Sequence, residues 1–301
     1  MENEIKKAIL PIAGLGTRFL PLSLVLPKEL WPLADVPALQ YIIEEIKLAG
    51  IQEVILVMSP DKKIIMDYLG VLPRQKRIAR ASKIEKILKE RKKDSILDSL
   101  KKFQESLEGL VFSCLFQKKP LGDGDAVLQA AKAIGNEPCA VLFGDDIVDA
   151  KIPCISQLFN VFKTGGKPVM ALSHLPKEKL PSYGVVDVEK IANRLFKVKG
   201  IIEKPAIDEA PSDLAVVGKY ILTPEVFSYL KTVAPDKSGE IKLAGAFDQM
   251  IKDDKIIYGC EFDGRWLECG NKLDWLKSHF YFSLKHPQYG PEIKSFLQEI
   301  L

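Results

Sequence analysis

The sequence predicts an α/β fold in which a mixed, mostly parallel central sheet is flanked by helices. In its first half, short apolar runs alternate with amphipathic stretches, which is the pattern of successive βα units. In its second half the apolar runs follow one another more closely, so we expect some antiparallel pairing. We find neither an internal repeat nor a Gly/Ser linker, and 301 residues with 47% hydrophobic content can form a sizeable core. We therefore expect one domain spanning residues 1–301.

Each element follows from hydrophobic periodicity, with strands at short apolar runs and helices where apolar residues recur every three to four positions. The expected strands are Lys7–Ile12, Glu53–Met58, Leu110–Phe116, Cys139–Phe143, Pro168–Ser173, Gly184–Val188, Val198–Glu203 and Val216–Leu222. The expected helices are Pro37–Ala49, Asp61–Leu69, Gly124–Ile134, Pro224–Lys231, Glu240–Lys252 and Asn271–Leu284, with a further amphipathic helix at Pro291–Leu301.

Residues 74–108 differ in composition, because lysines and arginines are crowded there among few acids. Isoleucines and leucines recur in this segment at helical spacing, which indicates one or two amphipathic helices. We interpret the segment as a basic, solvated helical excursion within the domain. A surface for nucleic acid or membrane is the alternative.

Composition argues against several classes of protein. A net charge of +3 is too small to indicate nucleic acid or an anionic membrane as a partner. The N-terminus has no apolar signal region, and no run of about 18 apolar residues occurs, so we expect a cytoplasmic protein. The five cysteines form no Cys-x-x-Cys pair and the three histidines lie away from every motif below, so disulfide, zinc and histidine-based chemistry are poorly supported.

The most informative local pattern is Gly14-Leu15-Gly16-Thr17-Arg18, which follows the first expected strand. Glycines allow a tight turn whose N–H groups can face an anion, and Arg18 and Lys28 add positive charge. The loop is not a dinucleotide-binding fingerprint, because Phe19 takes the place of its third glycine, and the chain has no P-loop string. An ordinary strand-to-helix turn is the alternative. The combination predicts a transferase that uses a nucleoside triphosphate.

Several motifs in order along the chain carry a family resemblance. They are Gly14–Pro21, Pro27–Pro32, Ser182–Val186, Glu203–Pro205, Ala210–Gly218 and Cys269–Asn271. With these motifs the chain resembles bacterial UTP–glucose-1-phosphate uridylyltransferases, within the sugar-1-phosphate nucleotidyltransferase family. The resemblance implies a single Rossmann-like domain of the nucleotide-diphospho-sugar transferase type. It also implies transfer of the uridylyl group of UTP to glucose 1-phosphate with Mg²⁺ as cofactor, and a homodimer or homotetramer.

The resemblance also implies roles for individual residues. The expected catalytic residues are Arg18, Lys28 and Lys204, and the expected metal ligands are Asp145 and Glu268. The expected nucleotide-binding residues are Ala13, Gly14, Gly16, Thr17, Glu29, Gln117 and Gly122. The expected sugar-binding residues are Gly184, Glu203, Val217 and Gly218, with Asn271 near the same pocket.

Independent chemical arguments accompany three of these assignments. Asp145 follows a buried strand, where open α/β sheets bind ligands, although an acid there can also cap a helix, a role that fits Asp146 better. A glutamine amide such as that of Gln117 can pair with the imide edge of uracil or thymine. Glu203 and Lys204 are adjacent in sequence, so both can face one ligand only if the strand ends or bulges there. Pro205 favours an end.

The chain also departs from the family pattern. Leu24 replaces a lysine, Asp123 and Asp125 replace an apolar residue and a histidine, Ala244-Gly245 replaces Thr-Asp, and Glu268 replaces an aspartate. We expect these changes to make the surroundings of the phosphate and base sites more negative. Two alternatives to the uridylyltransferase therefore stay open. One is a catalytically weak homologue that binds nucleotide sugars, and the other is the same chemistry with dTTP or another hexose 1-phosphate.

Overall fold

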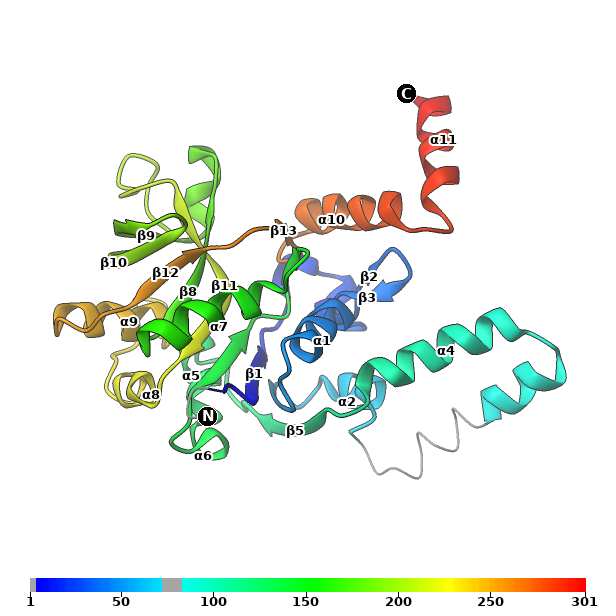
Figure 1. Cartoon of the computed structure of the whole chain (residues 1–301), viewed down its shortest axis with the longest axis horizontal. Coiled ribbons are helices and arrows are strands. Elements are labelled where there is room, and N and C mark those ends of the chain that lie inside the picture. Colours follow the sequence, from blue (N-terminus) through cyan, green and yellow to red (C-terminus); the bar gives the residue numbers. More distant parts are fainter. Residues whose placement is uncertain (1–3, 72–82) are drawn as a thin grey trace.

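The computed structural model describes residues 4–71 and 83–301, and a nine-stranded sheet lies at its centre (Figure 1). The strand order is β5-β4-β1-β6-β11-β8-β12-β10-β9. The strands are β1 (Lys7–Ile12), β4 (Glu53–Met58), β5 (Val111–Phe116), β6 (Cys139–Leu142), β8 (Val169–His174), β9 (Gly184–Ala192), β10 (Leu195–Glu203), β11 (Leu214–Leu222) and β12 (Tyr258–Glu261). Two small sheets pair β2 (Pro32–Leu33) with β3 (Val36–Pro37), and β7 (Asp146–Asp149) with β13 (Arg265–Glu268).

The central sheet is mixed, as the sequence predicts. β1 pairs in parallel with β4 and β6, and β4 pairs in parallel with β5. β11 runs antiparallel to both β6 and β8, and β10 runs antiparallel to β9 and β12. β8 and β12 pair in parallel, so four of the eight neighbouring pairs are parallel and four antiparallel, and the sheet is less parallel than expected.

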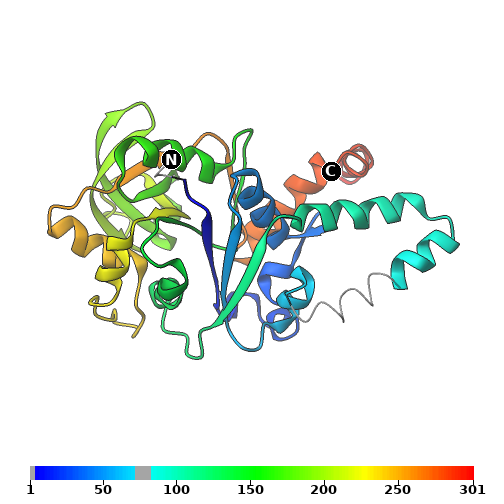
Figure 2. The ribbon, with the colours of Figure 1, turned by 60° about the horizontal axis from the view of Figure 1, so that its bottom comes forward.

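Helices cover both faces of the sheet, as Figure 2 shows. One face carries α1 (Ala38–Leu48), α2 (Lys63–Leu69) and α7 (Cys154–Gly165), and the other carries α5 (Asp123–Gln129), α6 (Ala131–Ile134), α8 (Pro224–Leu230) and α9 (Leu243–Lys252). The sequence of β1 is a continuous apolar run because the strand is buried on both faces. Leu10 packs into the core on one face of the sheet, and Ile9 packs into the core on the other. Each such buried side chain contributes about 1.5–3 kcal/mol to stability.

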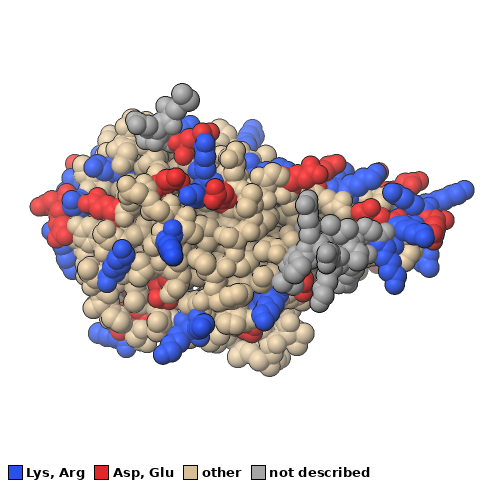
Figure 3. Space-filling view, turned by 90° about the horizontal axis from the view of Figure 1, so that it is seen from below, with Lys and Arg blue, Asp and Glu red and all other residues tan. Residues whose placement is uncertain are grey.

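A helical projection extends from this body (Figures 1 and 2). It contains α4 (Asp94–Leu107) and the helical residues 83–90, and Gln104 donates a hydrogen bond of 3.0 Å from one helix to Glu85 of the other. Leu97 and Leu107 bury the apolar side of α4, and Lys and Arg side chains stand out on the projection in Figure 3. Residues 72–82 of the expected basic excursion lie outside the described residues.

The chain ends in two helices, α10 (Lys272–Lys285) and α11 (Gly290–Ile300). α10 packs beside β13 and so connects the C-terminal segment to the edge of the sheet described below. Within residues 4–71 and 83–301, no helix combines the length and the apolar character needed to cross a membrane.

All of the expected strands and helices are present, with shifted ends and one break. The helix expected at Gly124–Ile134 is divided at Ala130, and the helix expected from Glu240 begins at Leu243. α7 was not among the expected helices, although its buried residues Ile155, Leu158, Phe159 and Phe162 follow a helical period. The four-residue strands β7, β12 and β13 were also not expected, because they are too short for a periodic signal and are stabilised by their pairing partners.

Candidate active site

The site lies at the carboxyl ends of β1 and β6. These strands are parallel neighbours, so the segment after Ile12 and the segment after Leu142 emerge at the same edge of the sheet. Gly16 adopts φ +66°, a left-handed conformation that few residues tolerate. A side chain added at Gly14 would meet no protein atom within 4 Å, so the loop borders open space there. The predicted glycine loop therefore faces a cavity rather than the core.

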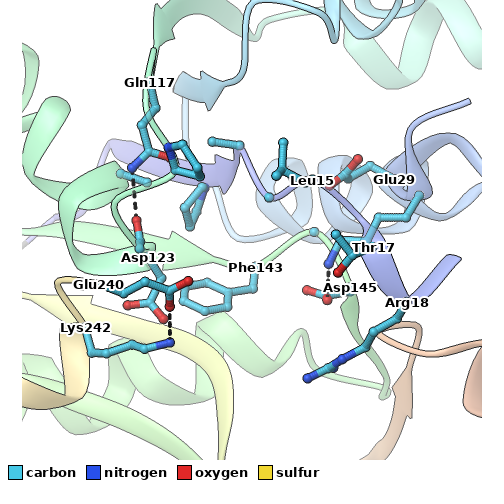
Figure 4. A pocket seen from close by; sticks show the side chains of 18 residues that line it. Leu15, Thr17, Arg18, Glu29, Gln117, Asp123, Phe143, Asp145, Glu240 and Lys242 are labelled. Carbon is cyan, nitrogen blue, oxygen red and sulfur yellow. Dashed lines mark hydrogen bonds and ion pairs between the residues drawn. The ribbon is translucent and has the colours of Figure 1, made fainter. Parts of the chain in front are cut away.

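The first cavity has a volume of about 430 Å³ and lies between this loop and the start of α5 (Figure 4). Expected nucleotide-binding and catalytic residues form much of its wall, with the acid after β6 at one end. These are Ala13, Gly14, Thr17, Arg18, Lys28, Glu29, Gln117, Gly122 and Asp145. Gly16 lines a smaller cavity beside Arg18 and Lys28. The structure thus brings together the expected nucleotide-binding residues.

A second cavity of about 270 Å³ adjoins the first. Expected sugar-binding residues line it, namely Gly184, Glu203 and Gly218, together with Lys204 and Glu268. Five residues border both cavities: Arg18, Asp123, Phe143, Asp145 and Lys242. A ligand in one cavity would therefore meet a ligand in the other beside a guanidinium and a carboxylate.

Three carboxylates gather at this junction because β7 and β13 pair antiparallel. Glu268 lies opposite Asp146 in that pairing, and the Cys269 N–H donates to the Asp145 carbonyl at 2.7 Å. Burial, together with the charges of Asp145 and Glu268, raises the pKa of Asp146 to about 7. Burial also raises the pKa of Glu268, which accepts a hydrogen bond from the Tyr183 hydroxyl.

Lys28 neutralises one of these acids directly by forming an ion pair with Asp145. Burial acts to lower the pKa of Lys28, but the charges of Asp145 and Glu29 outweigh it and raise that pKa to about 12. Burial likewise acts to raise the pKa of Asp145, and the ammonium of Lys28 reverses this so that the pKa lies below its usual value. Lys28 therefore remains a cation and Asp145 an anion at neutral pH.

The donor set at the junction fits a hard divalent cation that also binds phosphate. A Cβ added at Gly270 would lie 3.2 Å from Asp145 Oδ2 and 2.9 Å from Glu268 Oε1, so both carboxylates face the same glycine. Across the described ranges, no group of three or more acidic, histidine or cysteine side chains is arranged to hold a metal alone. Mg²⁺ commonly takes one or two carboxylates and completes its shell with water and phosphate oxygens.

The glycine loop rests on a buried ion pair that the sequence analysis did not identify. Lys62 donates to both carboxylate oxygens of Glu29, at 2.8 and 2.9 Å, and to the Ile12 carbonyl at 2.8 Å. Both side chains are almost fully buried. Glu29 was expected to bind nucleotide, and it does border the first cavity, but its carboxylate is bonded to Lys62. Lys62 follows the carboxyl end of β4, which is a parallel neighbour of β1. A lysine after a neighbouring parallel strand is therefore the sequence signal that could have identified this ion pair.

Glu203 and Lys204 face the same cavity because the strand ends between them, which confirms the expectation stated above. β10 ends at Glu203, and Lys204 adopts φ +51° with its N–H donating to the Tyr183 carbonyl at 2.9 Å. The Lys204 ammonium lies 3.8 Å from the Glu203 carboxylate. Glu203 Oε2 would lie 3.2 Å from a Cβ at Gly184, so that glycine keeps space beside the acid.

Gln117 is held at the far end of the first cavity. Its amide nitrogen donates to the Gly122 carbonyl at 3.0 Å and to Asp125 Oδ2 at 2.6 Å. Gly122 adopts φ +103°, and a Cβ there would lie 2.4 Å from the Ile241 carbonyl oxygen, so only glycine fits this turn.

The structure leaves two expectations about individual residues as predictions and shows that a third is wrong. The Val217 side chain packs into the core while Val216 and Gly218 border the second cavity, so any contact of Val217 with a sugar would be through its backbone. Asn271 caps α10 by accepting from the Asp274 N–H at 3.0 Å, and it borders neither cavity. Asp146 begins a strand instead of capping a helix, and its Oδ1 accepts from the Trp266 indole at 2.8 Å.

The departures from the family pattern are spread more widely than expected. Leu24 and Gly245 border neither of the two cavities, and a Cβ built at Gly245 would lie 3.2 Å from Val233 Cγ2. Asp123, Ala244 and Glu268 do border the second cavity. Lys242 borders both cavities and was not among the expected site residues. It is the third residue of the sequence Glu-Ile-Lys-Leu that begins at Glu240. It offsets part of the negative charge of Asp123.

A glycine loop that borders a cavity, with cations and paired acids beside it at the edge of a mixed sheet, is typical of a nucleotide-dependent transferase. Residues 7–281 match the nucleotidyl transferase family, and the chain belongs to that family. It is 40% identical over 298 residues to a UTP–glucose-1-phosphate uridylyltransferase of Staphylococcus haemolyticus, with 99% of both chains covered. A protein of the same name from Staphylococcus saprophyticus is 39% identical over 297 residues, again with 99% coverage of each chain.

Solved structures give the same result. A UTP-bound UGPase from Acinetobacter baumannii is 33% identical, with a TM-score of 0.85 over 99% of this chain and 100% of that chain. A UDP-glucose pyrophosphorylase complexed with UDP-glucose is 31% identical, with a TM-score of 0.81 over 94% of this chain and 100% of that chain. The expected fold class and family are therefore confirmed.

Proposed function

We propose that the protein transfers the uridylyl group of UTP to glucose 1-phosphate, forming UDP-glucose and pyrophosphate. The observation that carries this proposal is the junction of the two cavities at Arg18 and Asp145. A nucleotide in the first cavity and a sugar phosphate in the second would bring their phosphates together there. The names and bound ligands of the relatives described above supply the identity of the two substrates.

The protein has to align the two substrates and neutralise the charge of their phosphates, whereas the reaction needs little proton transfer. An oxygen of the sugar phosphate attacks the α-phosphorus, and the bond from that phosphorus to the bridging oxygen of pyrophosphate breaks. Arg18 and Lys28 border the first cavity, where they would neutralise the triphosphate and the leaving pyrophosphate. Lys204 borders the second cavity, where it would bind the sugar phosphate, and Glu203 would accept hydrogen bonds from sugar hydroxyls.

Asp145 and Glu268 would hold Mg²⁺, since both carboxylates face Gly270. When bound, Mg²⁺ supplies charge neutralisation for the phosphates that meet at the junction. The side chains of this chain would do the remaining work, because Lys28 stays cationic beside Asp145 and Tyr183 orients Glu268 through its hydroxyl.

Assembly into a homodimer or homotetramer and a cytoplasmic location complete the proposal. Large apolar side chains stand exposed on the last two helices, which supports self-association; they are Leu273, Leu276, Phe280, Phe296 and Ile300. Light scattering of the purified chain tests the assembly. The location remains a prediction from the sequence.

The decisive experiment measures pyrophosphate release by the purified protein. UTP, dTTP, CTP, ATP and GTP are crossed with glucose, galactose and mannose 1-phosphates, with Mg²⁺ or with a chelator. We expect turnover with UTP, glucose 1-phosphate and Mg²⁺, and its loss in Asp145→Ala and in the double variant Arg18→Ala/Lys28→Ala. A different active pair would change the substrate and keep the chemistry. Folded protein that is silent with every pair would refute the transferase and favour the nucleotide-sugar-binding homologue.

A further inference from the structure

Gln117 offers only one polar atom to a ligand in the first cavity. Its side chain is 6% exposed, and both hydrogens of its amide nitrogen are used, one by the Gly122 carbonyl and one by Asp125. No residue in the described part of the chain donates a hydrogen bond to Gln117 Oε1. Gln117 borders the cavity, and the dashed line from its amide nitrogen in Figure 4 marks the hydrogen bond to the Gly122 carbonyl. The carbonyl oxygen is therefore the group left for recognition.

The chemistry of the two partners determines which way this amide faces. A carbonyl and a carboxylate both accept hydrogen bonds and cannot donate them. Rotation of the amide by half a turn would place Oε1 against both acceptors, with two bonds lost and repulsion in their place. Asp125 is itself only 7% exposed, and its other oxygen lies 3.4 Å from the Gln129 amide nitrogen, so the carboxylate is held in place.

Asp125 does not border the first cavity, so any effect on a ligand there must pass through Gln117. This residue is one of the departures from the family pattern, which has a histidine at the position. A histidine can donate as well as accept, and it would not impose one orientation on the amide in the way that a carboxylate does.

We infer that Asp125 is a positioning residue that makes Gln117 present an acceptor to the nucleobase. An acceptor matches the imide N3–H of uracil. It opposes cytosine, whose ring nitrogen N3 carries no hydrogen and is itself an acceptor. The inference rests on the proposed function, because it requires the base of the nucleotide to lie against Gln117. It assigns to Asp125, acting with the Gly122 carbonyl on the Gln117 amide, a part in the discrimination between uracil and cytosine nucleotides.

The test compares kcat/KM for UTP and CTP in the full chain, with Mg²⁺ and glucose 1-phosphate, for the wild type and Asp125→Asn. Asparagine keeps the size of the side chain but adds a donor that can bond to Gln117 Oε1 once the amide has rotated, so that the Gly122 carbonyl is the one remaining acceptor that opposes rotation. We expect the UTP:CTP ratio to fall roughly tenfold, through both a loss with UTP and a gain with CTP. A ratio unchanged in folded Asp125→Asn would overturn the inference.

Two further variants separate the inference from the proposed function. Gln117→Ala should lower the UTP:CTP ratio, and Gln117→Ala/Asp125→Asn should lower it no further, because Asp125 acts only through Gln117. If Gln117→Ala leaves the ratio unchanged, the base does not lie against Gln117 and the inference fails, while turnover of UTP and glucose 1-phosphate keeps the proposed function; absence of that turnover in the wild type would refute the proposed function. If Gln117→Ala lowers the ratio and Asp125→Asn does not, only the role of Asp125 fails.

Controls guard against a general loss of structure. Gln129→Ala removes the other contact of Asp125 and should leave the ratio unchanged, whereas a fall equal to that of Asp125→Asn would indicate a packing effect and overturn the inference. If Asp125→Asn does not fold, Asp125→Ser, whose hydroxyl donates or accepts, replaces it with the same expected fall. The rise in melting temperature on adding UTP or CTP repeats the comparison without turnover.

Discussion

Asp123 should make the protein less stable at neutral pH than at mildly acidic pH. Its carboxylate accepts from the Leu243 N–H at 2.8 Å, at the start of α9, where Lys242 supplies no side-chain cap. Burial raises the pKa of Asp123 from an ordinary value of 3.8 to about 6. Of the charges that face it, Lys242 acts to lower this pKa and Glu203 acts to raise it.

The sign follows from proton linkage. Because the pKa is higher in the folded state, the folded protein binds this proton more tightly than the unfolded chain does. Stability is therefore lost as the pH rises from the unfolded pKa through the folded one. A rise in pKa from 3.8 to about 6 corresponds to about 3 kcal/mol of stability over the whole pH range. Between pH 4.5 and 7 the loss is about 2 kcal/mol, since the unfolded carboxyl is already largely ionised at pH 4.5.

Urea unfolding followed by tryptophan fluorescence, for the wild type and Asp123→Asn from pH 4.5 to 7.5, measures this loss. Asparagine removes the charge and keeps an oxygen for the Leu243 N–H. The variant should gain about 2 kcal/mol on the wild type as the pH rises to 7. Asp67→Asn, at an exposed carboxylate of α2, is the matched control and should follow the wild type. Parallel stability curves for wild type and Asp123→Asn would refute the argument.

Three further substitutions test residues in and around the two cavities. Gly218→Ala would place a Cβ 2.3 Å from Asp146 Oδ2 and 2.7 Å from Phe143 Cβ, so unfolding in urea should show a loss of about 1–3 kcal/mol. Gly200→Ala, whose Cβ would lie 3.7 Å from Asp187 Cβ, is the control and should change little. Lys62→Met leaves the buried Glu29 carboxylate without its cation and should lower the free energy of unfolding by about 3–5 kcal/mol. The double variant Lys62→Met/Glu29→Gln should recover part of this loss. Full stability of the single variant would contradict the role of the ion pair. Lys204 is 46% exposed on its side chain, so Lys204→Ala should leave the melting temperature unchanged while raising KM for glucose 1-phosphate about tenfold or more, and unchanged kinetics would remove Lys204 from the site.

The elements that the sequence predicted best are those buried on both sides or marked by local chemistry. β1 and β4 were located to the residue, because strands buried on both faces are continuous apolar runs. The end of β10 at Glu203 was expected from Pro205. The short strands β7 and β13 were not, because their pairing joins segments that are far apart in the chain and leaves no local pattern.

For the site, the sequence by itself determined the glycine loop, the cations Arg18 and Lys28 and the acid after β6, since these depend on residue type next to a strand end. The tertiary structure alone decided which groups meet. It brought Glu268 opposite Asp146, buried Lys62 against Glu29 and turned Asp125 toward Gln117 instead of toward a ligand. Strand and loop ends reveal where a side chain starts, whereas its partner depends on packing between distant segments, which no local pattern records.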